Sequence, residues 1–188
     1  VDCLSSLTLD EAVDAKQIAI ETLSAYRRIG FSSSRLIEIC QILELICVAA
    51  TLGWIAQAPA GRDANEVVRA ITALQDQDGR WRNTSETAEV CLSLLRVSQR
   101  HPSLVPLDSI HEALTRGVEY LLRAYDVAAG NWDADVNATA KSIHAIVLFD
   151  QAVGYAATDF VTDIGTRQRR MAHSRMHGQE VTSSGTLL

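Results

Sequence analysis

Proline, glycine and aromatic residues are all scarce in this sequence. The 188 residues include 3 prolines and 10 glycines, and phenylalanine, tyrosine and tryptophan together make up only 5%. A turn-rich all-β fold and a disordered chain both need more proline and glycine than this. An excess of basic charge is also lacking, because the formal net charge is −6. We therefore expect no nucleic-acid partner.

Cysteines with metal-type spacing are absent, and so is an opening signal peptide. Cys40 and Cys47 lie seven residues apart, which puts them on one helical face where a disulfide is rarely possible. The apolar stretch 42–55 contains Glu44 and is too short to span a bilayer. Reduced, mostly buried thiols in a cytoplasmic protein are expected. Because the chain does not begin with methionine, we expect it to be a piece of a longer protein.

A turn that contains glycine and an aromatic residue recurs about every fifty residues. Gly79-Arg80-Trp81 precedes one apolar helical stretch, and Gly130-Asn131-Trp132 precedes another. Gly30-Phe31 stands between two earlier helical stretches at a similar interval. The sequence therefore predicts three helix–turn–helix units with a glycine at each turn.

Capping residues and the spacing of apolar side chains predict a helical chain without a sheet. Thr8 opens a capping box with Glu11, and Ser109 opens another with Glu112. Ile18, on the first helix, is expected in a buried stripe. The predicted helices cover approximately residues 8–29, 34–58, 63–78, 85–100, 109–124 and 136–156.

Each unit pairs an amphipathic first helix with a more apolar second helix, so stacking the units would bury the second helices. Three hairpins are too few for a closed ring. We expect an open arc, or half of an α/α toroid, over residues 1–165. Residues 166–188 form a separate polar C-terminal tail, expected to be solvated. Its basic residues are Arg167, Arg169, Arg170 and Arg175.

Two stretches share one pattern, which is a basic and a small residue, then apolar residues, then Gly-x-Trp. The stretches cover residues 69–81 and 116–132, with Ala73 at the usual aromatic position of the first. Both resemble the QW motif of the squalene-hopene cyclase-like family of terpene cyclases and protein prenyltransferases. The motif residues are Gln77, Gly79 and Trp81 in the first stretch, and Tyr125 (replacing glutamine), Gly130 and Trp132 in the second.

This resemblance implies a structural use of the motif. It implies that each tryptophan stacks near the start of a helix and that the glutamine ties neighbouring turns together by hydrogen bonds. A buried indole covers a large apolar surface and can fix the angle between paired helices. We therefore interpret Trp81 and Trp132 as residues that hold the fold, rather than as substrate contacts.

The resemblance also indicates where acids and metal ligands would lie. Asp133-Ala134-Asp135-Val136 matches the first two acids of the D-x-D-D motif of class II cyclases and lacks the last. Asp133 and Asp135 are thus the candidate catalytic acids, although both also suit the start of the sixth helix as caps. With His144 they are the nearest set to the Asp, Cys and His that hold zinc in prenyltransferases, but no cysteine follows them. We expect no metal and no cofactor.

Two functional hypotheses remain open. The first is a non-catalytic helical-repeat interaction module of a larger regulatory or sensory protein, which binds a protein partner or other domains of the parent chain. The second is a fragment of a class II terpene cyclase or prenyltransferase that acts on isoprenoid substrates. The low aromatic content argues against cyclisation, because carbocations are stabilised by aromatic rings. A homodimer that completes the ring and an apolar isoprenoid ligand are further expectations left open.

Overall fold

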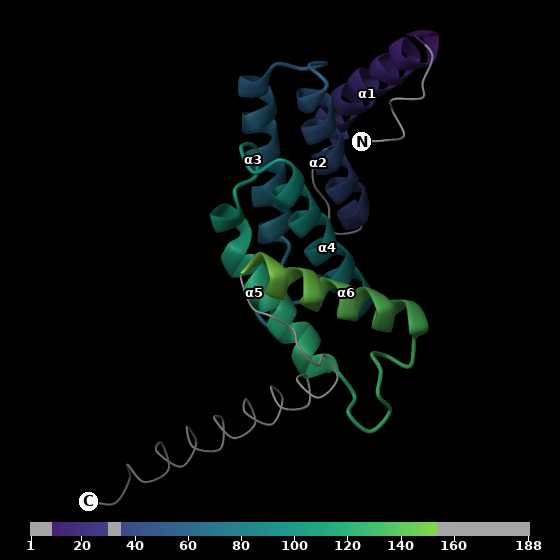
Figure 1. Ribbon diagram of the computed structural model, residues 1–188, viewed down its shortest axis with the longest axis vertical. Coiled ribbons are helices and arrows are strands. Elements are labelled where there is room, and N and C mark those ends of the chain that lie inside the picture. Colours follow the sequence, from purple (N-terminus) through teal and green to yellow (C-terminus); the bar gives the residue numbers. More distant parts are fainter. Residues whose placement is uncertain (1–8, 30–34, 154–188) are drawn as a thin grey trace, which may run out of the picture.

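The computed structural model describes residues 9–29 and 35–153, and this part of the chain is all-helical (Figure 1). Its only extended pairing is an isolated bridge between Asp126 and Asn131. Thr8, the Gly30-Phe31 turn and the tail 166–188 lie outside the described residues. The six helices are α1 (Leu9–Ile29), α2 (Leu36–Thr51), α3 (Gln57–Ala73), α4 (Thr84–Arg100), α5 (Leu107–Ala124) and α6 (Val136–Ala152).

Helix α4 is the centre of the described molecule. It packs between α2 and α6, and α5 packs against it as well. Helix α3 packs against α2, and α1 packs against α2 at the end of the molecule away from α5 and α6 (Figure 1). No helix within these residues is both long and apolar enough to cross a lipid bilayer.

The core lies where α4 meets its neighbours. Leu94 and Leu95 of α4 are fully buried, as are Leu114 and Leu121 of α5. Helix α4 also buries hydroxyl residues, of which Thr87 is fully enclosed and hydrogen-bonded to backbone groups. A helix of modest average hydrophobicity is thus enclosed, because its polar side chains are short and internally bonded.

Helix α2 ends earlier than its apolar sequence predicts. Gly53 adopts a φ of 70°, and the amide of Trp54 donates to the carbonyl of Ala49 over 2.8 Å. This is a glycine-centred C-terminal cap, which only glycine adopts without strain. The predicted extension to residue 58 is therefore wrong. Trp54 lies half-buried in the turn, and α3 begins at Gln57 rather than at residue 63.

Two smaller predictions about side chains are also wrong. Ile18, expected in the buried stripe of the first helix, is 62% exposed, because α1 packs mainly on α2 and leaves this side uncovered. Ser109 does not open a capping box, because its hydroxyl donates to the carbonyl of Pro106, which is the N-cap residue of α5.

Candidate functional site

Two tryptophans hold the two turns that precede α4 and α6. We call residues 75–83 the first turn and residues 125–135 the second turn. The indole Nε1 of Trp81 donates to the carbonyl of Ile71 over 2.8 Å, and that of Trp132 donates to Leu121 over 2.6 Å. Both indoles are fully buried. Each tryptophan therefore fastens the start of one helix to the end of the helix before it.

The backbone of the two turns is also arranged alike. The amide of Trp81 donates to the hydroxyl of Thr87 over 2.9 Å, as that of Trp132 does to Thr139 over 3.0 Å. In both turns the glycine two residues before the tryptophan has a positive φ, of 93° at position 79 and 69° at position 130. Fully buried indoles with matching donors, acceptors and glycines make the two turns versions of one structure.

The glutamine that ties neighbouring elements together is Gln75. Its Nε2 donates to the carbonyls of Gly79, over 2.8 Å, and Ala113, over 2.9 Å. Its Oε1 accepts from Nη2 of Arg116 over 2.6 Å. Gln77, the residue expected in this role, has an exposed side chain.

Gln75 and Tyr125 occupy matching positions, since each precedes the aspartate whose amide closes its turn. The ring of Tyr125 packs on the indole of Trp132, with centroids 4.6 Å apart. The first stretch is therefore shifted in register from its sequence alignment with the second.

The two candidate acids, Asp133 and Asp135, lie in the second turn, and His144 does not join them as a third metal ligand. Asp135 is the N-cap of α6, and its carboxylate accepts from the amides of Asn137 at 2.7 Å and Ala138 at 3.4 Å. Asp133 is exposed, with a φ of 54°. His144 is exposed on α6. Residues 9–29 and 35–153 contain no group of three side chains able to hold a metal ion.

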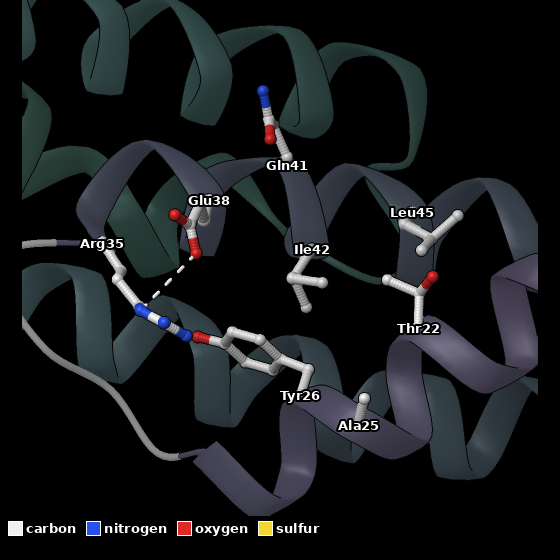
Figure 2. A pocket seen from close by; sticks show the side chains of 8 residues that line it. All are labelled: Thr22, Ala25, Tyr26, Arg35, Glu38, Gln41, Ile42 and Leu45. Atoms are coloured by element: carbon white, nitrogen blue, oxygen red, sulfur yellow. Dashed lines mark ion pairs between the residues drawn. The ribbon is translucent and has the colours of Figure 1, made fainter.

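An opening with a mixed polar and apolar lining lies between α1 and α2, and we call it the groove (Figure 2). Its volume is about 400 Å³. Ile18 is not among the lining residues, but it lies one helical turn before Thr22 on the same side of α1 and is exposed. The lining residues are Thr22, Ala25, Tyr26, Arg35, Glu38, Gln41, Ile42 and Leu45.

The polar groups of this groove differ in how they are held. Burial raises the pKa of the Tyr26 phenol to about 12, with smaller contributions from Cys40 and Glu38. The phenol therefore stays protonated at neutral pH. Arg35 pairs with Glu38 at 3.8 Å (Figure 2). Both of these side chains are substantially exposed, so the pair adds little stability and leaves both groups accessible to a ligand.

The thiols of the described residues are not available as nucleophiles. Cys40, Cys47 and Cys91 are buried and free. Burial is the main cause that raises the pKa of each thiol to about 12. Because the thiolate is the reactive form, these cysteines are inert near neutral pH.

Comparison with known proteins gives no relative on which a function could be based. No protein-family model matches the chain, and no match is found among curated proteins or among solved structures.

Proposed function

We propose that this chain is a non-catalytic helical-repeat interaction module, built as an arc of hairpins in a larger regulatory or sensory protein. Its docking site is the groove between α1 and α2. The occupant is an amphipathic helix from a protein partner or from another domain of the parent chain. The single observation that carries the proposal is this groove of about 400 Å³, in which apolar and polar side chains line one opening.

The lining favours a helix that carries an apolar stripe. Ile42 and Leu45 supply apolar surface from α2, and Ile18 is exposed on α1 close to the groove. Helix-in-groove recognition uses such a surface to receive apolar side chains spaced three or four residues apart. Asp14 and Glu21 are exposed on α1, so basic residues beside the apolar stripe of the partner would be favoured.

Two features support the non-catalytic part of the proposal. Asp135 is engaged in capping α6, which removes it from the role of a proton donor. The described thiols are kept protonated by burial. Both observations concern residues 9–29 and 35–153 alone.

Site-specific photo-crosslinking tests the proposal in cells that express the parent protein. A benzophenone amino acid replaces Ile18 close to the groove, and a matched one replaces Val136, which is 86% exposed on α6. We expect the Ile18 probe alone to capture one protein segment, identified by mass spectrometry. Equal capture from both positions would contradict a site in the groove.

The captured segment is then synthesised and titrated against the purified chain. Ala25→Trp fills the groove, whereas the control Ala140→Trp adds the same bulk on exposed α6. We expect Ala25→Trp to weaken binding by at least about tenfold and Ala140→Trp to leave it unchanged. Both variants should unfold near the temperature of the parent chain. Equal binding by Ala25→Trp would exclude the groove.

A second proposal is a fragment of a class II terpene cyclase or prenyltransferase that acts on isoprenoid substrates. The shared geometry of the Trp81 and Trp132 turns supports it, because the QW resemblance implies such paired structures. In that case the acids or zinc ligands lie elsewhere in the parent protein. A D-x-D-D motif or an Asp, Cys and His set in the full-length sequence, with turnover of an isoprenoid diphosphate, would favour this proposal. Their absence would leave the interaction module.

A further inference from the structure

Helix α5 covers the first turn closely. Nη2 of Arg116 reaches Gln75, and Nη2 of Arg123 donates to the carbonyl of Asp78 over 2.6 Å. Gly79 lies so near the backbone of Arg116 that a Cβ would come within 2.8 Å of its carbonyl carbon. Two arginines seven residues apart on one helix thus hold the turn, and the glycine lets the two backbones approach.

The second turn has the same architecture but no such cover among the described residues. Gly130 is exposed, and the atom nearest to a Cβ built there, the hydroxyl of Tyr125, is 3.8 Å away. Val127 in this turn is 63% exposed, and Val136 just after it is 86% exposed. The glycine that packs under α5 in the first turn is therefore exposed in the second turn, where Val127 is exposed beside it.

Charge distinguishes the two turns further. The first turn carries two aspartates and two arginines, and Arg80 pairs with Asp76 at 3.0 Å and with Asp78 at 3.5 Å. The second turn carries three aspartates and no basic residue, because Asn131 stands where the first turn has Arg80. A cover for the second turn therefore has to supply positive charge, and more of it than α5 supplies to the first.

A basic segment of the same chain follows α6 at the same separation in sequence at which the two arginines of α5 follow α4. Arg116 and Arg123 lie 16 and 23 residues after Arg100, the last residue of α4. The same intervals counted from Ala152, the last residue of α6, fall at positions 168 and 175. Position 175 is an arginine, and arginines flank position 168 on both sides.

We propose that the second turn is a docking surface for the basic segment 167–175 of the same chain. The arginines of this segment bind the second turn as Arg116 and Arg123 bind the first, and its apolar residues cover Val127. The inference is independent of the groove between α1 and α2, which lies at the other end of the molecule (Figure 1).

Photo-crosslinking on the full chain tests this proposal directly. A benzophenone amino acid replaces Val127 in the second turn, and the control replaces Val13, which is 59% exposed on α1. We expect the Val127 probe to give a monomeric product joined to residues 160–180. A product joined to a second copy, or no product with that segment, would overturn the proposal. The Val13 probe should give no such product.

Hydrogen exchange supplies a second readout that does not depend on a probe. Arg169→Glu with Arg175→Glu should raise amide exchange over residues 126–135 by about tenfold and leave residues 76–83 unchanged. Adding Asp133→Lys should slow this exchange again, because an exposed acidic residue of the second turn is then replaced by a basic one that can pair with the introduced glutamates. Unaltered exchange in the double arginine variant, or failure of Asp133→Lys to slow the exchange again, would count against the docking.

Discussion

Gly117 of α5 and the indole of Trp81 are in direct contact. A Cβ at position 117 would lie 2.8 Å from Cζ3 of Trp81 and equally close to the sulfur of Cys91. Alanine normally stabilises a helix interior by about 1 kcal/mol relative to glycine, but overpacking a core costs about 1 to 3 kcal/mol. We expect Gly117→Ala to lower the free energy of unfolding, by up to about 2 kcal/mol.

Helix α3 provides the matched control for this substitution. A Cβ at Gly61 would meet its nearest atom at 3.9 Å, so Gly61→Ala should stabilise the chain by about 0.5 to 1 kcal/mol. Urea unfolding of both variants measures the difference. If Gly117→Ala stabilised the chain as much as Gly61→Ala, the indole of Trp81 would have to shift at little cost. The contact between position 117 and this indole would then not constrain the packing of α5.

The hydroxyls of Thr87 and Thr139 each accept from the amide of a buried tryptophan. Valine keeps the shape of threonine but leaves that amide without its partner, at a cost of about 1 to 3 kcal/mol. Thr87→Val and Thr139→Val should therefore both lower the free energy of unfolding in urea. Thr115→Val, on α5, loses only a bond to its own helix and should change stability by less than about 0.5 kcal/mol. A loss in one turn alone would mean that the two turns are not energetically equivalent.

The helices were largely predictable from sequence, but their ends near α2 were not. Helix α4 was predicted over 85–100 and runs over Thr84–Arg100, because a polar capping region precedes an amphipathic pattern that a proline follows. Between α2 and α3 the apolar residues continue through the turn, so hydrophobicity gave no boundary. The local signal was Gly53, whose backbone conformation ends α2. The arrangement of the hairpins as an arc stays a prediction.

The candidate groove was not predictable at all. Tyr26 is partly buried and lines the groove, but the spacing of apolar residues along the first helix says nothing of an opening beside it. The groove exists because of the way α1 packs against α2. The sequence pattern within one helix does not specify how that helix packs on its neighbour. The exposure of the Ile18 side chain has the same cause, which is the packing of α1 on α2.

Substitutions at Asp135 can distinguish a helix-capping role of this residue from a role as a catalytic acid. Asparagine caps a helix about as well as aspartate, whereas alanine in place of a cap costs about 1 kcal/mol. We therefore expect Asp135→Ala to lower the free energy of unfolding by about 1 kcal/mol and Asp135→Asn to change it little. Asp133→Asn is the control, because Asp133 is exposed and asparagine tolerates its positive φ. If Asp135→Asn destabilised the chain as much as alanine does, the carboxylate charge would matter beyond the cap.

The buried thiols predict that stability falls in alkaline solution. Burial raises the pKa of Cys91 from 9.0 to about 12, and Cys40 and Cys47 are raised similarly. Above pH 9 the unfolded chain loses thiol protons that the folded chain retains, so the stabilisation is complete below pH 9 and is lost between pH 9 and about 12. Cys91→Ala should be less stable at pH 7 because of a cavity, but its stability should fall less steeply above pH 9. Urea unfolding under reducing conditions from pH 7 to 10 measures both slopes, below the range where Tyr26 adds its own contribution. Parallel curves for the two chains would mean that this thiol titrates alike in the folded and unfolded states.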